Sequence, residues 1–168
     1  MTLPFAALGA IVVALLETTV VPEVAIFGVQ ANLLLTLAVA ATVIMGIEDG
    51  LVWAFLGGLF VDMLTPARPI GATTFVLLIV VGIAALSTRF VGQTRAGAVL
   101  LVFALTWVYY LLMLATLALT EGAAGSFDLQ HVLGAAVINT LLAVPIVALF
   151  VVIERRFGNQ DRERAAWT

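Results

Sequence analysis

The sequence predicts an all-α polytopic membrane protein with six transmembrane helices in a single domain. Hydrophobic residues make up 64% of the 168 residues and charged residues only 10%, and the mean hydropathy is +1.23. A soluble domain usually carries about 25% charged residues, so this composition indicates a chain that is folded in lipid. The apolar stretches are interrupted by short polar segments, which give the number of helices.

The first three spans are expected at residues 3–21, 33–47 and 50–64. The first is long enough to cross a hydrocarbon core of about 30 Å. The second and third have about 15 residues each and would reach only about 23 Å. They could be two short crossings, or a pair that does not cross fully and is buried by its neighbours. We expect two short helices.

Small residues recur at every fourth position from the end of the second span along the third. These are Gly46, Gly50, Ala54 and Gly58, and Asp62 continues the spacing. On a helix this spacing places them on one stripe, along which another helix can approach closely. The stripe therefore predicts a packing face, and the neighbour can be the next span of this chain or a partner protein.

Two acids lie in the last turns of predicted spans, where the helix dipole opposes a negative charge by about 0.3–1 kcal/mol. Asp62 shares its stripe with small residues, so we expect it to be buried and compensated, and Arg68 is the nearest cation in the sequence. Glu17 ends the first span. We interpret it as an acid that reaches the membrane interface, in preference to a partner site.

The last three spans are expected at residues 70–88, 96–119 and 131–153. The fifth carries Tyr109 and Tyr110 near its middle, away from the membrane interface where aromatic belts form. We therefore expect these rings to pack inside the bundle.

Two residues of the sixth span are predicted to shape its packing. Asn139 lies mid-span, where a polar side chain usually hydrogen-bonds across helices. Pro145 should bend the helix or free a carbonyl. His131 opens this span, and we interpret it as an interfacial residue because no cysteine or second histidine could join it as a metal ligand.

The arginines predict the topology. Six of the seven lie in the loop at 89–95 and in the short basic tail at 154–168, which two spans separate. The positive-inside rule makes that side cytoplasmic and places both termini inside. Arg68 is the exception, on the outer side.

Residue types that commonly act in catalysis or bind metals are scarce. One histidine, no cysteine and no lysine argue against an enzyme, a metal site or a bound cofactor. Basic clusters with interleaved aromatic residues are missing, which argues against nucleic-acid binding.

An ordered set of positions resembles the rod shape-determining protein MreD family. Asn32 precedes a leucine-rich span, a small-residue helix ends in Gly58 and Asp62, and Gly71 opens the next span. Ala31 stands where the family often has proline. The last span matches with Asn139, Pro145 and the basic pair Arg155 and Arg156.

This resemblance implies a six-helix bundle related in fold to the substrate-binding subunits of energy-coupling-factor vitamin transporters. It implies a non-enzymatic scaffold of the cell-wall elongation complex in the bacterial inner membrane, which helps to maintain rod shape. The implied partner is MreC, and through it RodA, a penicillin-binding transpeptidase and the MreB filament, with membrane lipid around the helices.

Two other functions compete with the scaffold. A substrate-binding subunit of a vitamin transporter would use the stripe of Ala6, Ala10 and Ala14 for docking. Against it, the outer loops offer few convergent polar groups for a small solute. A small channel or ion transporter would need more buried charge than Asp62, Glu17 and Asn139 provide.

Overall fold

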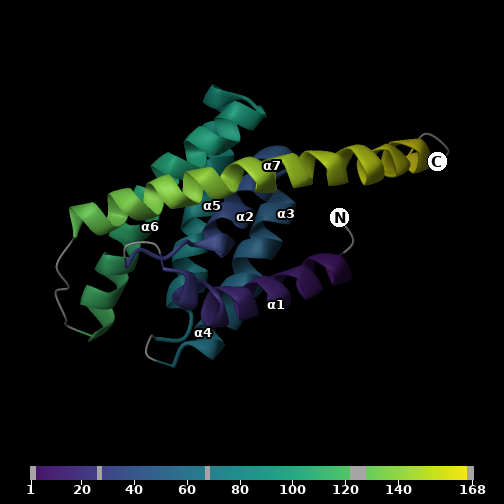
Figure 1. Ribbon diagram of the computed structural model, residues 1–168. Helices are drawn as coiled ribbons and strands as arrows, with labels where there is room; N and C mark the ends of the chain where they lie inside the picture. Colours follow the sequence, from purple (N-terminus) through teal and green to yellow (C-terminus); the bar gives the residue numbers. More distant parts are fainter. Residues whose placement is uncertain (1–2, 26–27, 67–68, 122–127, 166–168) are drawn as a thin grey trace.

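The computed structural model describes residues 3–25, 28–66, 69–121 and 128–165, and the elements in these residues are helical (Figure 1). The all-α prediction is therefore confirmed. In chain order the helices are α1 (Leu3–Thr19), η1 (Val21–Val24), α2 (Leu33–Ile44), α3 (Ile47–Val52), η2 (Trp53–Gly57), α4 (Gly58–Leu64), α5 (Ala72–Val91), α6 (Arg95–Glu121) and α7 (Leu129–Ala165).

Three of the described helices are long and apolar enough to cross a membrane: α5, α6 and α7. The apolar helices α1 and α2 are shorter. The chain is thus a helical membrane protein with three full-length candidate spans, and the six-crossing topology stays a prediction. Helix α7 continues past residue 153 as far as Ala165, so most of the basic tail extends the last helix.

Helix α2 lies at the centre of the bundle. Only Leu33 and Leu37 among its residues are not fully buried, and the helix packs against α1, α3, α5, α6 and α7. Its 12 residues span about 18 Å. Because protein surrounds it on several sides, its ends need not reach both membrane surfaces. The structure thus favours burial by neighbours for this segment.

The third predicted span is one helix with an irregular turn. Elements α3, η2 and α4 follow one another without a break from Ile47 to Leu64, and η2 is a π-helical turn at Trp53–Gly57. Such turns appear as single-turn insertions within α-helices. Its first residue, Trp53, meets Phe150 of α7 edge-to-face, with ring centroids 6.2 Å apart.

The small-residue stripe faces the chain's own bundle. Gly50, Ala54, Gly58 and Asp62 are buried. A Cβ added to Gly58 would lie 2.7 Å from the Cα of Thr74 in α5. A Cβ at Gly50 would collide with the Thr42 side chain of α2. The sequence left open whether the stripe packs against this chain or against a partner protein. In the structure it packs against helices of the same chain.

Gly46 does not belong to this packing face, so its inclusion in the stripe was wrong. It lies before the first residue of α3 with φ +113°, and a Cβ there would meet nothing within 4 Å. Such a φ is accessible to glycine without strain. Gly46 therefore serves the sharp turn from α2 into α3.

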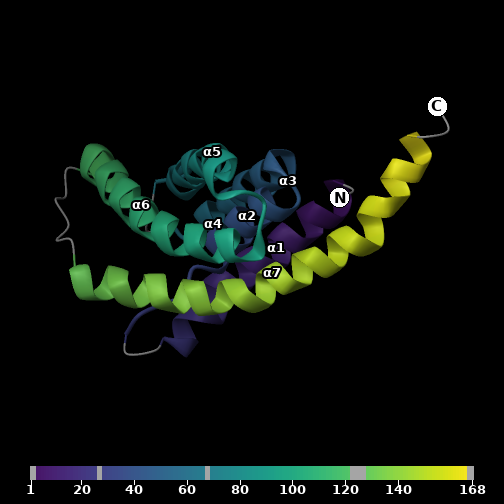
Figure 2. The same ribbon diagram turned by 90° about the horizontal axis from the view of Figure 1, so that it is seen from above.

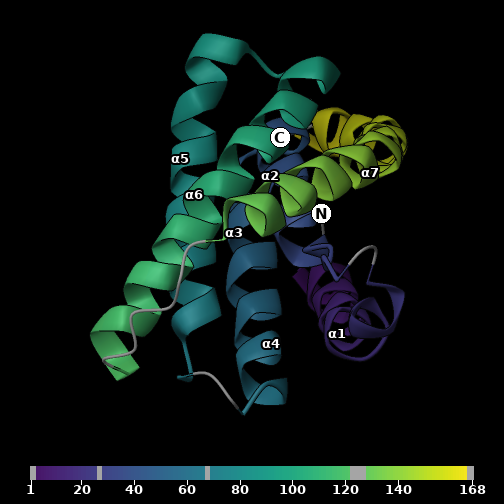
Figure 3. The ribbon, with the colours of Figure 1, turned by 60° about the vertical axis from the view of Figure 1, so that its left-hand side comes forward.

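The helices form two sets with different directions. Figure 3 shows α5 running alongside the continuous α3–α4 helix. Figures 1 and 2 show α1 and α7 lying across them, with α7 visibly curved. Pro145 lies inside α7 without ending it, as expected for a residue that bends a helix by removing one backbone donor.

Substituting Gly58 tests the close approach of α4 to α5. We expect Gly58→Ala to lower the unfolding midpoint in mild detergent by about 2–10 °C, because the added methyl forces the backbones apart. Gly82→Ala is the matched control, since a Cβ at Gly82 in α5 meets nothing within 4 Å. That variant should keep or raise the midpoint. Equal midpoints for both variants would contradict the packing.

Candidate functional site

Asp62 joins the end of α4 to the start of α5. Its side chain is 1% exposed. Oδ1 accepts a hydrogen bond from the Thr73 backbone N–H at 3.0 Å. Oδ2 accepts from the backbone N–H groups of Gly71 at 3.1 Å and Thr74 at 3.0 Å, and from the Thr74 hydroxyl at 2.8 Å. The carboxylate therefore caps α5 from another helix.

This arrangement explains how a buried acid is tolerated at a helix end. The first N–H groups of α5 have no partner within their own helix and carry a partial positive charge. The Asp62 carboxylate satisfies them and offsets its unfavourable position at the end of α4. The expected burial of Asp62 is confirmed. Arg68, which the sequence suggested as its partner, lies outside the described residues.

Glu17 has a similar role at the start of α2. Its Oε2 accepts hydrogen bonds from the backbone N–H of Leu33 at 2.7 Å and of Leu34 at 3.3 Å. Asn32 adds a local cap, since its side chain accepts from the Leu35 N–H at 2.8 Å. The structure therefore favours the alternative that the sequence left open for Glu17, a polar residue with partners inside the bundle. It is half-buried and holds α1 to α2.

Asn139 connects three helices at the same end of α2. Its Oδ1 accepts from the Asn32 backbone N–H at 2.7 Å, and its Nδ2 donates to the Thr106 hydroxyl of α6 at 3.2 Å. The side chain is 0% exposed. The predicted cross-helix hydrogen bonding of Asn139 is thus observed, and it ties α7 to both α6 and the start of α2.

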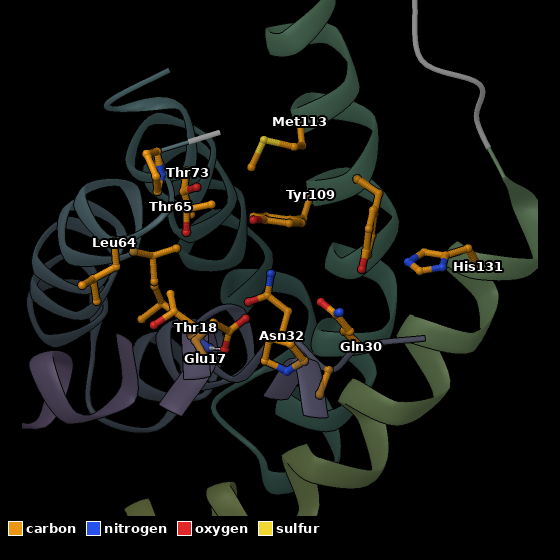
Figure 4. Close-up of a pocket in the computed structure, with 16 residues that line it drawn as sticks. Glu17, Thr18, Gln30, Asn32, Leu64, Thr65, Thr73, Tyr109, Met113 and His131 are labelled. Atoms are coloured by element: carbon orange, nitrogen blue, oxygen red, sulfur yellow. Dashed lines mark hydrogen bonds between the residues drawn. The ribbon is translucent and has the colours of Figure 1, made fainter. Parts of the chain in front are cut away.

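A pocket of about 380 Å³ lies among these helix ends (Figure 4). Its walls come from the end of α1, the end of α4, the starts of α2, α5 and α7, and the middle of α6. Polar and aromatic residues line much of it, chiefly Glu17, Asn32, Thr73, Tyr109, Tyr110 and His131.

The aromatic side of the pocket is a row of three rings. Tyr109 and Tyr110 meet edge-to-face at 5.7 Å between centroids, and Tyr110 meets His131 in the same way at 5.9 Å. Tyr109 is 4% exposed, so the predicted packing of this ring inside the bundle is confirmed. Within the described ranges, no group of three His, Cys, Asp or Glu side chains gathers as a metal site.

The sequence did not reveal this pocket. The outer loops were expected to offer few convergent polar groups for a solute, but Gln30, Asn32 and Thr65 from two of them line one pocket. Residues from the segments at 17–32, 64–73 and 131 meet at one place. Each of these segments borders a predicted helix end, which the sequence does show. That these helix ends lie close together is visible only in the folded structure.

No protein-family model, curated protein or solved structure matches this chain. The resemblance to the MreD family therefore rests on the residues named above.

Asp62→Asn tests the cap on α5. The amide keeps one acceptor oxygen but turns a donor toward backbone N–H groups, so we expect a loss of about 1–3 kcal/mol in the free energy of unfolding. Glu48→Gln is the control, because Glu48 is an exposed acid in the first turn of α3. Its loss should be at most about 1 kcal/mol. Unfolding in mild detergent measures both, and an Asp62→Asn variant as stable as Glu48→Gln would disprove the cap.

Asn139→Leu tests the junction of α2, α6 and α7. The change leaves the Asn32 N–H without its acceptor, at an expected cost of about 1–3 kcal/mol. Thr140→Val is the matched control, since the Thr140 hydroxyl bonds only a carbonyl of its own helix, that of Ala136. Thermal unfolding of the two variants should separate clearly, and a stable Asn139→Leu variant would show that the junction is dispensable.

Proposed function

We propose that the chain is an MreD-like, non-enzymatic scaffold of the bacterial cell-wall elongation complex, which binds MreC in the inner membrane and helps to maintain rod shape. One observation supports this most. Positions that carry the family resemblance are the same positions that join the helices to one another in this structure, namely Asn32, Gly58, Asp62, Gly71 and Asn139. Matching residues that share one structural role support a family resemblance better than matching residues scattered along the chain.

We also propose the topology that the arginines predict, with six crossings and both termini in the cytoplasm. Two of the segments that this topology places outside, and His131 at the start of the sixth predicted span, supply residues to the same pocket. The loop with Arg89 and Arg95 lies at the opposite end of α5 from the Asp62 cap. Figures 1 and 2 show the beginning of α1 and the end of α7 on the same side of the molecule.

The stripe is not available to a partner. Gly50 and Gly58 already touch α2 and α5, so MreC would bind elsewhere on the bundle. Substitutions in the stripe should therefore affect folding before they affect the complex.

Purification from a rod-shaped bacterium tests the proposal. The tagged chain is extracted in mild detergent and its companions are identified by mass spectrometry, with an unrelated multi-pass protein as the control bait. We expect a bitopic protein with a periplasmic coiled coil, accompanied by RodA and a penicillin-binding transpeptidase. Depleting the chain should make the cells round.

Two results would contradict the scaffold. Recovery of a pair of ATPases with a shared membrane subunit would instead support the vitamin-transporter alternative. Normal rod shape after depletion would separate the chain from the elongation machinery altogether.

A further inference from the structure

Thr73 carries a buried hydroxyl without a hydrogen-bond partner in the described structure. The residue is 4% exposed and its Oγ1 makes no hydrogen bond, although the residue lines the pocket. It lies in the first turn of α5, where no preceding helical turn offers a carbonyl to the hydroxyl. An unpaired buried hydroxyl destabilises the fold, because it has given up its hydrogen bonds to water without replacing them. The neighbouring Thr74 hydroxyl, by contrast, is bound to Asp62.

The opposite side of the pocket offers aromatic surface. Figure 4 shows Tyr109 and Thr73 extending into the pocket from α6 and α5. Tyr109 meets Tyr110 edge-to-face, and Tyr110 meets His131 in the same way. Such rings bind a further flat ring by stacking or by edge contacts at 4.5–7 Å.

The pocket is held in shape by the caps. The Thr73 backbone is fixed by Asp62, and the Asn32 backbone is fixed by Asn139. A site whose walls are already ordered loses little free energy to ordering when a ligand binds. Its volume of about 380 Å³ falls in the range that is usual for small-molecule sites.

The side chains on these walls suit an uncharged ligand. The carboxylate among the lining residues is that of Glu17, and its Oε2 accepts bonds from the backbone N–H groups of Leu33 and Leu34. Most of the other polar lining groups are hydroxyl, amide and aromatic side chains. We propose that the pocket binds a small, flat, uncharged organic molecule, whose ring packs on Tyr109 and Tyr110 and whose amide or hydroxyl group hydrogen-bonds to Thr73 Oγ1. This goes beyond the scaffold and does not depend on it.

Binding to the purified full-length chain in detergent tests the inference with matched probes. Naphthalene-2-carboxamide is flat and neutral, its amidinium and carboxylate analogues carry opposite charges, and decalin-2-carboxamide is saturated. Calorimetry should show saturable binding of the flat amide and weaker binding of the other three. No binding of the flat amide up to about 1 mM, or preferential binding of a charged or saturated analogue, would overturn the proposal.

Two variants locate the site. Thr73→Val is nearly isosteric and removes a hydroxyl that has no partner, so the ligand-free protein should be at least as stable as the wild type. Its affinity for the amide should fall about three- to ten-fold. Ala31→Leu adds bulk to the pocket lining and should also weaken binding.

Thr116→Val is the control, because the Thr116 hydroxyl bonds the Leu112 carbonyl of its own helix and the residue does not line the pocket. This variant should bind the amide as the wild type does. Unchanged affinity in both Thr73→Val and Ala31→Leu would show that the ligand binds elsewhere and would refute the assignment.

Discussion

The structure depends on how the N–H groups at buried helix starts are satisfied. Water is absent from the interior of a membrane bundle, so the first turn of each helix must find acceptors in the protein. In α5 and α2 these acceptors are carboxylates that project from the ends of other helices, Asp62 and Glu17. Each cap therefore acts as a tertiary contact, and it fixes where one helix begins relative to the end of another.

The other features of the bundle follow from these junctions. Once Asp62 fixes the start of α5, α4 and α5 lie so close that only glycine fits at position 58. Once Glu17 and Asn139 fix the start of α2, this short helix can remain in the middle of the bundle. The pocket lies where the two capped starts come together, which explains why its walls are polar in a chain that is otherwise so apolar.

The sequence predicted the helical class, the burial of Asp62 and the cross-helix role of Asn139, because composition and isolated polar residues in apolar spans are informative. It did not predict the central position of α2, since lipid and protein core are equally apolar and leave no polar face to distinguish them. It left the partner of Asp62 open and named only Arg68 as the nearest cation, because a sequence does not show which backbone N–H groups will need an acceptor. The partners of Glu17 are backbone groups too, which is why the sequence favoured the interfacial alternative for this residue. The misplacement of Gly46 reflects a backbone angle that residue spacing does not encode.

Hydrogen–deuterium exchange of the wild-type chain in detergent tests the central claim most directly. First-turn amides usually exchange quickly, as we expect for Gln130 and His131, whose cap from Asp128 is exposed to solvent. If the interhelical caps exist, the amides of Leu33, Leu34, Thr73 and Thr74 should exchange far more slowly than these. Exchange at the α2 and α5 starts as fast as at the α7 start would contradict the account.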